Sequence, residues 1–140
     1  MQDNNLTRFT QAQKSTYETV LSELRNGHKQ THWMWFIFPQ IAGLGRSETA
    51  RYYAIKNRKE ALEYLNHPIL ESRLIECTEA VLAIEGRTVS QIFGYPDDMK
   101  FKSCMTLFAA VSPYSVFESA LDKFFGGESD GRTLKLLENL

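Results

Sequence analysis

The sequence predicts an all-α fold, in which residues 1–140 form a compact single domain of about seven mostly short helices. Three observations support this prediction. Apolar residues recur at spacings of three and four over most of the chain, as they do along one face of a helix. No long stretch alternates between apolar and polar residues as strands do. The connecting segments are short, so the helices should pack as neighbours in one body.

The first predicted helix covers about residues 6–25, where the apolar positions keep helical spacing. Ser15 or Thr16 is expected to cap its main part. Glu18 would then lie in the first turn, where the helix dipole favours an anion. Gly27 suits the C-terminal end, because glycine readily adopts the left-handed conformation found there.

The next segment, residues 32–47, reads HWMWFIFPQIAGLGRS and contains both tryptophans of the chain. A short helix capped by Thr31 is one interpretation of its first half, and a buried strand-like segment is the other. On a helix this half would be apolar on all sides. We therefore expect it to cross the centre of the domain and to contribute mainly to the core.

The rest of the chain divides into helices with recognisable starts and stops. Ser47 is a good N-cap for a helix that is interrupted near residues 56–58 and resumes over 60–65. Pro68 suits the first turn of the next helix, which ends at Gly86. The remaining elements are a short turn at 90–93 closed by Gly94, a helix that begins at Pro96-Asp97-Asp98 and ends before Pro113, a helix over 116–125 stopped by Gly126-Gly127, and a last helix over about 132–138.

The composition is ordinary for a globular protein, with 43% hydrophobic and 24% charged residues and a formal net charge of -1. This balance lacks the basic excess that binding to nucleic acid or to an anionic membrane requires, so we expect neither partner. Cys77 and Cys104 stand apart, with no CxxC motif and no histidine cluster around them. We therefore expect no disulfide framework, no metal site and no bound cofactor.

The N-terminal stretch MQDNNLTRFTQ is polar and lacks the basic start and apolar stretch of a signal peptide. No window of the sequence approaches the roughly 20 consecutive apolar residues that cross a bilayer. We therefore expect a cytoplasmic protein.

The segment 32–47 is also the first candidate for ligand binding. Its tryptophans and histidine carry N–H groups that need partners when buried. Glycines before a helix N-terminus let backbone N–H groups approach an anion, and an arginine can hold phosphate through two hydrogen bonds. The spacing is neither that of a P-loop nor that of the dinucleotide-binding GxGxxG motif. The candidate ligand-binding residues here are His32, Trp33, Trp35, Gln40, Gly43, Gly45, Arg46 and Ser47.

The second candidate segment is PDDMKFKSCMTLF. Asp98 and Lys102 would form an ordinary i,i+4 pair on a helix, and a solvated helix face is the alternative to a site. Lys100 falls between two apolar residues, where its ammonium could be partly desolvated and more reactive. Ser103 and Thr106 also have apolar neighbours, so their hydroxyls should be half-buried. We assign Asp98 and Lys100 as candidate catalytic residues, and Ser103 and Thr106 as candidate ligand-binding residues.

Four stretches of the chain occur in the order HWMWFIFPQIAGLGRSETARYYAI, HPIL, PDDMKFKSCMTLFAA and DKFFGG. In this order they resemble the signature blocks of a bacterial family, the domain of unknown function 1810, over nearly the whole chain. The resemblance implies a small, mainly helical single domain without an established activity. Such proteins are often labelled calpastatin. A calpastatin-type inhibitor is a disordered chain rich in charge and proline, whereas this chain has 12% aromatic residues and four prolines.

A second and more remote resemblance is carried by the pattern Asp98-x-Lys100-x-x-Ser103-x-x-Thr106-x-Phe108. This pattern is similar to one in the helical NADAR superfamily, which is associated with NAD and ADP-ribose chemistry. The resemblance implies a class of ligand and assigns no catalytic role to any residue.

Two functions follow as hypotheses, and the sequence leaves open whether any reaction is catalysed. In the first, the protein binds or processes a phosphate-containing small molecule such as a nucleotide or an ADP-ribose derivative. Trp33 or Trp35 would stack on it, Arg46 would hold phosphate, Asp98 would be a general base or ribose anchor, and Lys100 an electrostatic partner. This requires the two candidate segments to lie side by side. In the second, the chain is a non-enzymatic interaction domain, monomeric or homodimeric, whose aromatic residues form core or a partner surface.

Overall fold

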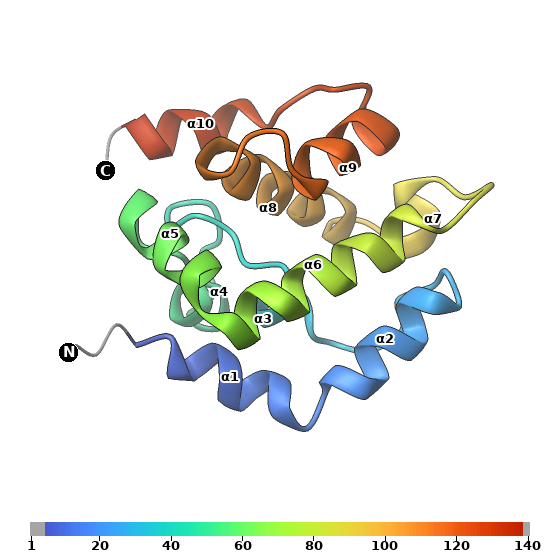
Figure 1. Ribbon diagram of the computed structural model, residues 1–140, viewed down its shortest axis with the longest axis horizontal. Coiled ribbons are helices and arrows are strands. Elements are labelled where there is room, and N and C mark those ends of the chain that lie inside the picture. Colours follow the sequence, from blue (N-terminus) through green and yellow to red (C-terminus); the bar gives the residue numbers. More distant parts are fainter. Residues whose placement is uncertain (1–4, 139–140) are drawn as a thin grey trace.

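A computed structural model describes residues 5–138, and this part of the chain folds into ten helices (Figure 1). The helices are α1 (Thr7–Lys14), α2 (Tyr17–Arg25), α3 (Met34–Ile37), α4 (Glu48–Tyr53), α5 (Arg58–Asn66), α6 (Pro68–Leu82), α7 (Val89–Phe93), α8 (Asp97–Val111), α9 (Val116–Phe125) and α10 (Gly131–Glu138). The all-α prediction is confirmed. The predicted number of about seven was too low, because several predicted segments contain breaks that their hydrophobic spacing does not reveal.

The first such break divides the helix predicted over residues 6–25 into α1 and α2. Thr16 occupies the N-cap position of α2, but its side chain makes no capping hydrogen bond. Figure 1 shows that the chain turns sharply between the two helices, so that they cover different parts of the core. The spacing of apolar residues continues across the turn, which is why the sequence alone does not show it.

Local signals placed most of the other boundaries correctly. The Ser47 hydroxyl accepts a hydrogen bond from the Ala50 N–H at 3.1 Å and so caps α4 as predicted. Pro68 lies in the first turn of α6. Gly126 ends α9 with a φ of 62°, in the left-handed region that favours glycine. These signals depend only on neighbouring residues, and the sequence contains all of them.

The first half of the segment 32–47 contains a short helix, the first of the two predicted conformations, and the only extended pairing within residues 5–138 follows it. Met34–Ile37 form the single turn α3. Further along, Ile41 forms an isolated parallel bridge with Ile55, with hydrogen bonds of 2.8 Å from Ala42 N–H to the Ile55 carbonyl and from Ile55 N–H to the Gln40 carbonyl. The segment lies in the core as predicted, with Trp33, Met34, Ile37 and Phe38 all buried.

Helix α8 is the centre of the fold and packs against α5, α7, α9 and α10. Its fully buried residues occur on every side of the helix, which is the pattern expected of a core helix. They include Phe101, Cys104, Met105, Leu107 and Phe108. Both cysteines of the chain, Cys77 and Cys104, are free and buried. None of the helices in residues 5–138 has the length and apolar character needed to span a membrane.

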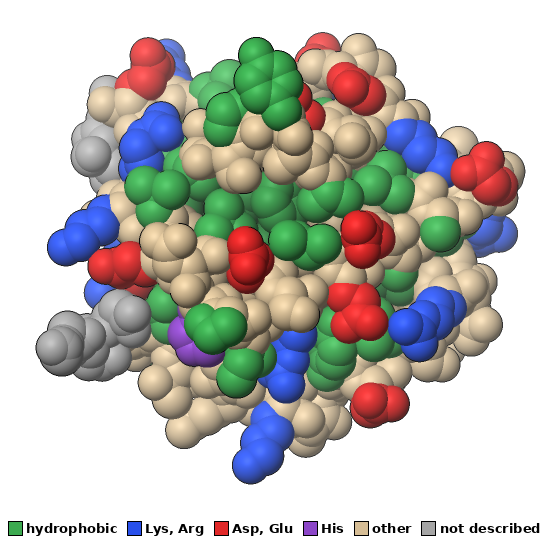
Figure 2. All heavy atoms as spheres, in the orientation of Figure 1, with side chains coloured by type: hydrophobic (Ala, Val, Ile, Leu, Met, Phe, Trp, Pro, Cys, Tyr) green, Lys and Arg blue, Asp and Glu red, His purple; other side chains and the backbone are tan. Residues whose placement is uncertain are grey.

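An apolar groove of about 370 Å³ lies between α5, α6 and the connection from α8 to α9. Figure 2 shows apolar side chains gathered across the middle of the face on which α6 and α9 lie. The residues that line the groove are Leu62, Leu65, Asn66, Glu71, Ile75, Val111, Ser112, Ser115, Val116 and Phe117.

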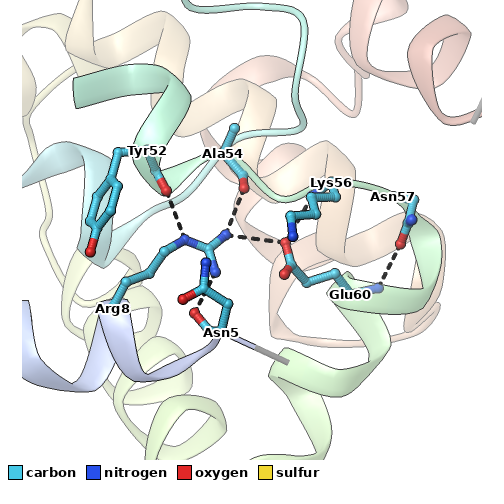
Figure 3. A network of polar contacts seen from close by, with 7 residues as sticks. All are labelled: Asn5, Arg8, Tyr52, Ala54, Lys56, Asn57 and Glu60. Carbon is cyan, nitrogen blue, oxygen red and sulfur yellow. Dashed lines mark hydrogen bonds and ion pairs between the residues drawn. The ribbon is translucent and has the colours of Figure 1, made fainter. Parts of the chain in front are cut away.

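A buried arginine joins α1 to the segment between α4 and α5 (Figure 3). The Arg8 guanidinium donates to the carbonyls of Tyr52 and Ala54, both at 2.7 Å, and to Glu60 Oε1 at 3.1 Å. The side chains of Arg8 and Glu60 are only 2% and 6% exposed. Glu60 Oε1 also accepts the Lys56 N–H at 2.9 Å. Arg8 and Glu60 therefore provide hydrogen-bond partners for the Tyr52 and Ala54 carbonyls and the Lys56 N–H, which no helical hydrogen bond satisfies.

Replacing Arg8 with methionine should destabilise the protein by about 3–5 kcal/mol, because the Glu60 carboxylate would stay buried without its partner. The double variant Arg8→Met/Glu60→Met should lose less than the single variant. Urea unfolding followed by circular dichroism measures both. Arg51→Met, in an exposed position on α4, is the matched control. A loss below about 1 kcal/mol for Arg8→Met would contradict the importance of this pair.

Candidate functional site

The fold brings the two candidate segments together at one pocket of about 230 Å³, lined by both polar and apolar side chains. The pocket lies between the loop after α3, the first turns of α8 and the start of α10, which packs along α8 (Figure 1). Its lining residues are Gln40, Leu44, Pro96, Met99, Lys100, Ser103, Asp130 and Arg132. Gln40, Lys100 and Ser103 are among the residues predicted from the sequence. The spatial condition of the first hypothesis is therefore met.

Lys100 is partly buried and is restrained by two neighbours. Its Nζ lies 3.4 Å from Asp97 Oδ1 and 5.4 Å from the centre of the Trp35 ring. The other oxygen of Asp97, Oδ2, lies 2.9 Å from Lys29 Nζ. Lys29 Nζ in turn lies 5.1 Å from the centre of the Trp33 ring. One carboxylate thus lies between two ammonium groups, and each ammonium is placed over a tryptophan face, where the ring attracts a cation.

Asp98 does not line the pocket. It is 7% exposed and faces α7, where Oδ2 accepts a hydrogen bond from Ser90 Oγ at 2.7 Å. Its Oδ1 accepts the Met99 N–H at 2.8 Å. The predicted pair with Lys102 is not formed, because Lys102 binds Glu128 and lowers the pKa of that carboxyl. Asp98 therefore links α7 to α8, and the carboxylate beside Lys100 is that of Asp97.

A carboxylate directly before α10, that of Asp130, forms part of the pocket and was missed by the sequence analysis. Asp130 Oδ2 accepts hydrogen bonds from Ser103 Oγ at 2.9 Å and from the Thr133 hydroxyl. The Asp130 N–H donates to Thr106 Oγ1 at 2.9 Å, and Thr106 donates to the Lys102 carbonyl. Ser103 and Thr106 are buried more completely than predicted, and together they join α10 to α8.

Arg132 is the second pocket residue that the sequence analysis missed. The local signal for both residues is the stretch Asp130-Gly-Arg-Thr133, in which an aspartate precedes a helix by one residue, as at an N-cap. The predicted start of this helix was correct to within one residue. Whether Asp130 and Arg132 face α8 depends on how α10 packs against α8. The residues of this short stretch do not determine that packing.

Trp33 is a core residue, and its ring is not exposed to a ligand. Its Nε1–H donates to Glu23 Oε1 at 2.9 Å. The same carboxylate accepts the N–H groups of Gln30 at 2.7 Å and Thr31 at 3.1 Å, and the Thr31 hydroxyl at 2.6 Å. Thr31 therefore binds Glu23 and does not cap α3. Burial raises the pKa of Glu23, but the hydrogen bonds from Thr31, Gln30 and Trp33 outweigh it and leave the pKa lowered.

The predicted anion-binding turn is explained largely by packing. A Cβ on Gly43 would lie 3.0 Å from Leu136 of α10, and φ is +106° at this glycine. A Cβ on Gly45 would lie 2.5 Å from the Cβ of Ala50. Arg46 is exposed, does not line the pocket and has no hydrogen bond or ion pair within residues 5–138.

Four other predicted residues also lie outside the pocket, namely His32, Trp35, Ser47 and Thr106. His32 is exposed in the connection before α3. Thr106 accepts the Asp130 N–H and lines a different cavity, of about 370 Å³. In the described range, no group of three or more histidine, cysteine, aspartate or glutamate side chains could hold a metal ion.

These features define a small helical protein with a pocket of polar and apolar side chains between its central helix and its last helix. The chain belongs to the family described as protein of unknown function DUF1810, whose model matches residues 3–137. Its structure is similar to the crystal structure of the conserved hypothetical protein Rv1873 from Mycobacterium tuberculosis, with a TM-score of 0.94 and 47% sequence identity over 96% of each chain. The comparison with curated proteins gives no match. The resemblance predicted from the four sequence blocks is confirmed.

The Glu23 carboxylate should stabilise the fold only where it is ionised. Its pKa is lower in the folded protein, so the stabilisation is present above the unfolded pKa of about 4.3 and is lost as pH falls through the folded pKa. Glu23→Gln should lose about 1–3 kcal/mol at pH 7. The difference from the unsubstituted protein should shrink in urea titrations below about pH 4. Glu18→Gln, exposed on the same helix, is the control. A difference that does not change with pH would contradict this role.

Proposed function

We propose that this protein binds a small phosphate-containing molecule in the pocket between α8 and α10. The observation that supports the proposal best is the presence of two cationic side chains, Lys100 and Arg132, among the lining residues. Guanidinium and ammonium groups are the usual protein ligands of phosphate. Gln40 adds an amide from the other candidate segment.

Arg132 is the better candidate for the role that the sequence analysis gave to Arg46. Arg132 lines the pocket together with Lys100, whereas Arg46 lies outside it. Lys100 can turn toward a phosphate without leaving a carboxylate unpaired, because Asp97 keeps its shorter contact of 2.9 Å with Lys29. The exchange should therefore require little free energy.

Trp35 would mark the edge of the bound ligand. It is partly exposed and lies against Lys100, whereas Trp33 is buried. In a nucleotide or an ADP-ribose derivative, the base or the second sugar would extend toward this ring while the phosphate contacts Lys100 and Arg132. We confine the proposal to binding, because the pocket carboxylate, Asp130, already accepts two hydroxyl hydrogen bonds and is a weak candidate for a general base.

Titration with inorganic phosphate, AMP, ADP-ribose and NAD should give a saturable change in tryptophan fluorescence and a rise in melting temperature for at least one compound. Lys100→Met and Arg132→Met should each weaken binding by about 10–100-fold, as expected for the loss of a charge-assisted hydrogen bond. Trp35→Phe should abolish the fluorescence change but keep the thermal shift.

Lys135→Met, exposed on α10, is the matched control for this experiment and should bind as the unsubstituted protein does. Loss of binding in Arg46→Met with retention in Arg132→Met would move the site to the turn before α4. No response to any compound, in a protein that melts cooperatively, would contradict the proposal.

The apolar groove favours a second candidate function, that of an interaction domain. Near it lie the exposed apolar side chains of Leu62, Ile69 and Tyr114, which are 42%, 48% and 95% exposed. Under this alternative, two copies of the chain would pair through the groove.

Sedimentation equilibrium at micromolar concentrations tests this alternative. A homodimer that dissociates on dilution and is abolished by Leu62→Glu would support it, because a charge in the groove opposes burial there. Leu134→Glu, a similarly exposed position on α10, is the control. A monomer at every concentration would exclude pairing through this groove.

A further inference from the structure

We propose that the ligand of this pocket is a small phosphomonoester that carries hydroxyl groups, of about the size of a sugar phosphate. This inference rests on the proposed function and narrows it. Under this inference, inorganic phosphate is not the preferred ligand. An intact dinucleotide is too large for the pocket to enclose.

The volume of the pocket sets the size of the ligand. At about 230 Å³ it is smaller than the roughly 300–1,000 Å³ typical of sites for drug-sized molecules. NAD and ADP-ribose are at least drug-sized, so only one phosphorylated part of either molecule could be enclosed here. A single phosphorylated sugar or polyol matches the space more closely.

The cations of the pocket favour a monoester over a diester. Lys100 and Arg132 both line the pocket. When Lys100 turns away from Asp97, the Asp97 carboxylate keeps its ion pair with Lys29. A phosphomonoester carries a charge of about −1.5 to −2 at neutral pH, because its second pKa is near 6. A diester carries a single charge and leaves one of the two cations unpaired.

Two other polar side chains that line the pocket, those of Asp130 and Gln40, favour a ligand with hydrogen-bond donors. Asp130 Oδ2 is occupied by the hydroxyls of Ser103 and Thr133, whereas Oδ1 accepts no hydrogen bond from residues 5–138. The Gln40 side chain also makes no hydrogen bond within the described residues, and its amide can both donate and accept. Ligand hydroxyls would satisfy both groups. A bare phosphate would leave them unsatisfied and would face the negative charge of Asp130.

The apolar residues of the pocket complete this specificity. Leu44, Pro96 and Met99 lie among the polar lining residues. They suit the C–H groups of a sugar or polyol, which an inorganic anion lacks. The lining of the pocket thus combines cations that suit a phosphate, polar groups that can accept hydroxyl protons, and apolar side chains.

Calorimetric titration at pH 7.5 with glycerol 3-phosphate, ribose 5-phosphate, methyl phosphate, inorganic phosphate and ADP-ribose tests the inference. Methyl phosphate is the matched control, since it is a monoester without hydroxyls. One of the two hydroxylated monoesters should bind at least about tenfold more tightly than methyl phosphate, as expected for one or two added hydrogen bonds.

Two variants test the groups assigned to the ligand hydroxyls. Gln40→Leu should reduce the advantage of the hydroxylated monoester over methyl phosphate to less than about threefold. Gln11→Leu, exposed on α1, is its control. Asp130→Asn should weaken the hydroxylated monoester but strengthen methyl phosphate, because it removes a repelling charge. Asparagine is also a good N-cap, so α10 should keep its start.

The outcomes distinguish this inference from the proposed function. If no phosphate compound binds, both fail. If methyl phosphate binds as tightly as the hydroxylated monoesters, the proposed function stands and this inference is overturned. If ADP-ribose binds more than tenfold more tightly than ribose 5-phosphate, the argument from pocket size is overturned. Should Asp130→Asn fail to fold, Gln40→Leu still decides between these outcomes.

Discussion

The carboxylate of Glu23 determines the path of the chain between α2 and α3, and the candidate site depends on that path. It is 7% exposed and accepts four hydrogen bonds, from Gln30, Thr31 and the Trp33 indole. With Trp33 fixed in the core, Lys29 lies over its ring and pairs with Asp97, which in turn pairs with Lys100. Glu23 thus acts on the pocket indirectly: it holds Trp33, the Trp33 ring lies against Lys29, and Lys29 shares the Asp97 carboxylate with Lys100.

Two other buried polar side chains act in the same way on backbone groups near helix ends. Arg8 donates to the carbonyls of Tyr52 and Ala54, and Gln13 Nε2 donates to the Phe36 carbonyl at 2.7 Å. Helices satisfy most of their own backbone groups, whereas helix ends, turns and connections that cross a core need partners from elsewhere. The ten helices of residues 5–138, most of them short, leave many such segments. The buried arginine, glutamine and glutamates supply their partners, and the site is built on one of these segments.

The sequence was informative where the relevant signal is local. Ser47, Pro68 and Gly126 placed helix ends, and the two motif segments were correctly expected to lie side by side. It was uninformative where the answer depends on how one helix is rotated against another. Adjacent residues on a helix point about 100° apart, so spacing alone could not assign the Lys100 contact to Asp97 and the α7 contact to Asp98. Arg8 and Glu60 are 52 positions apart, and nothing local relates them.

The two candidate binding surfaces differ in how far their side chains are already held in place before anything binds. Asp130 is held by Ser103 and Thr133, and Asp97 keeps its pairing with Lys29 when Lys100 turns toward a phosphate. A side chain already held in place loses less rotamer freedom on binding, which leaves more of the interaction energy for affinity. The exposed apolar side chains beside the groove have no such restraint, and pairing through it would have to order them. This difference favours the pocket over the groove as the candidate binding site.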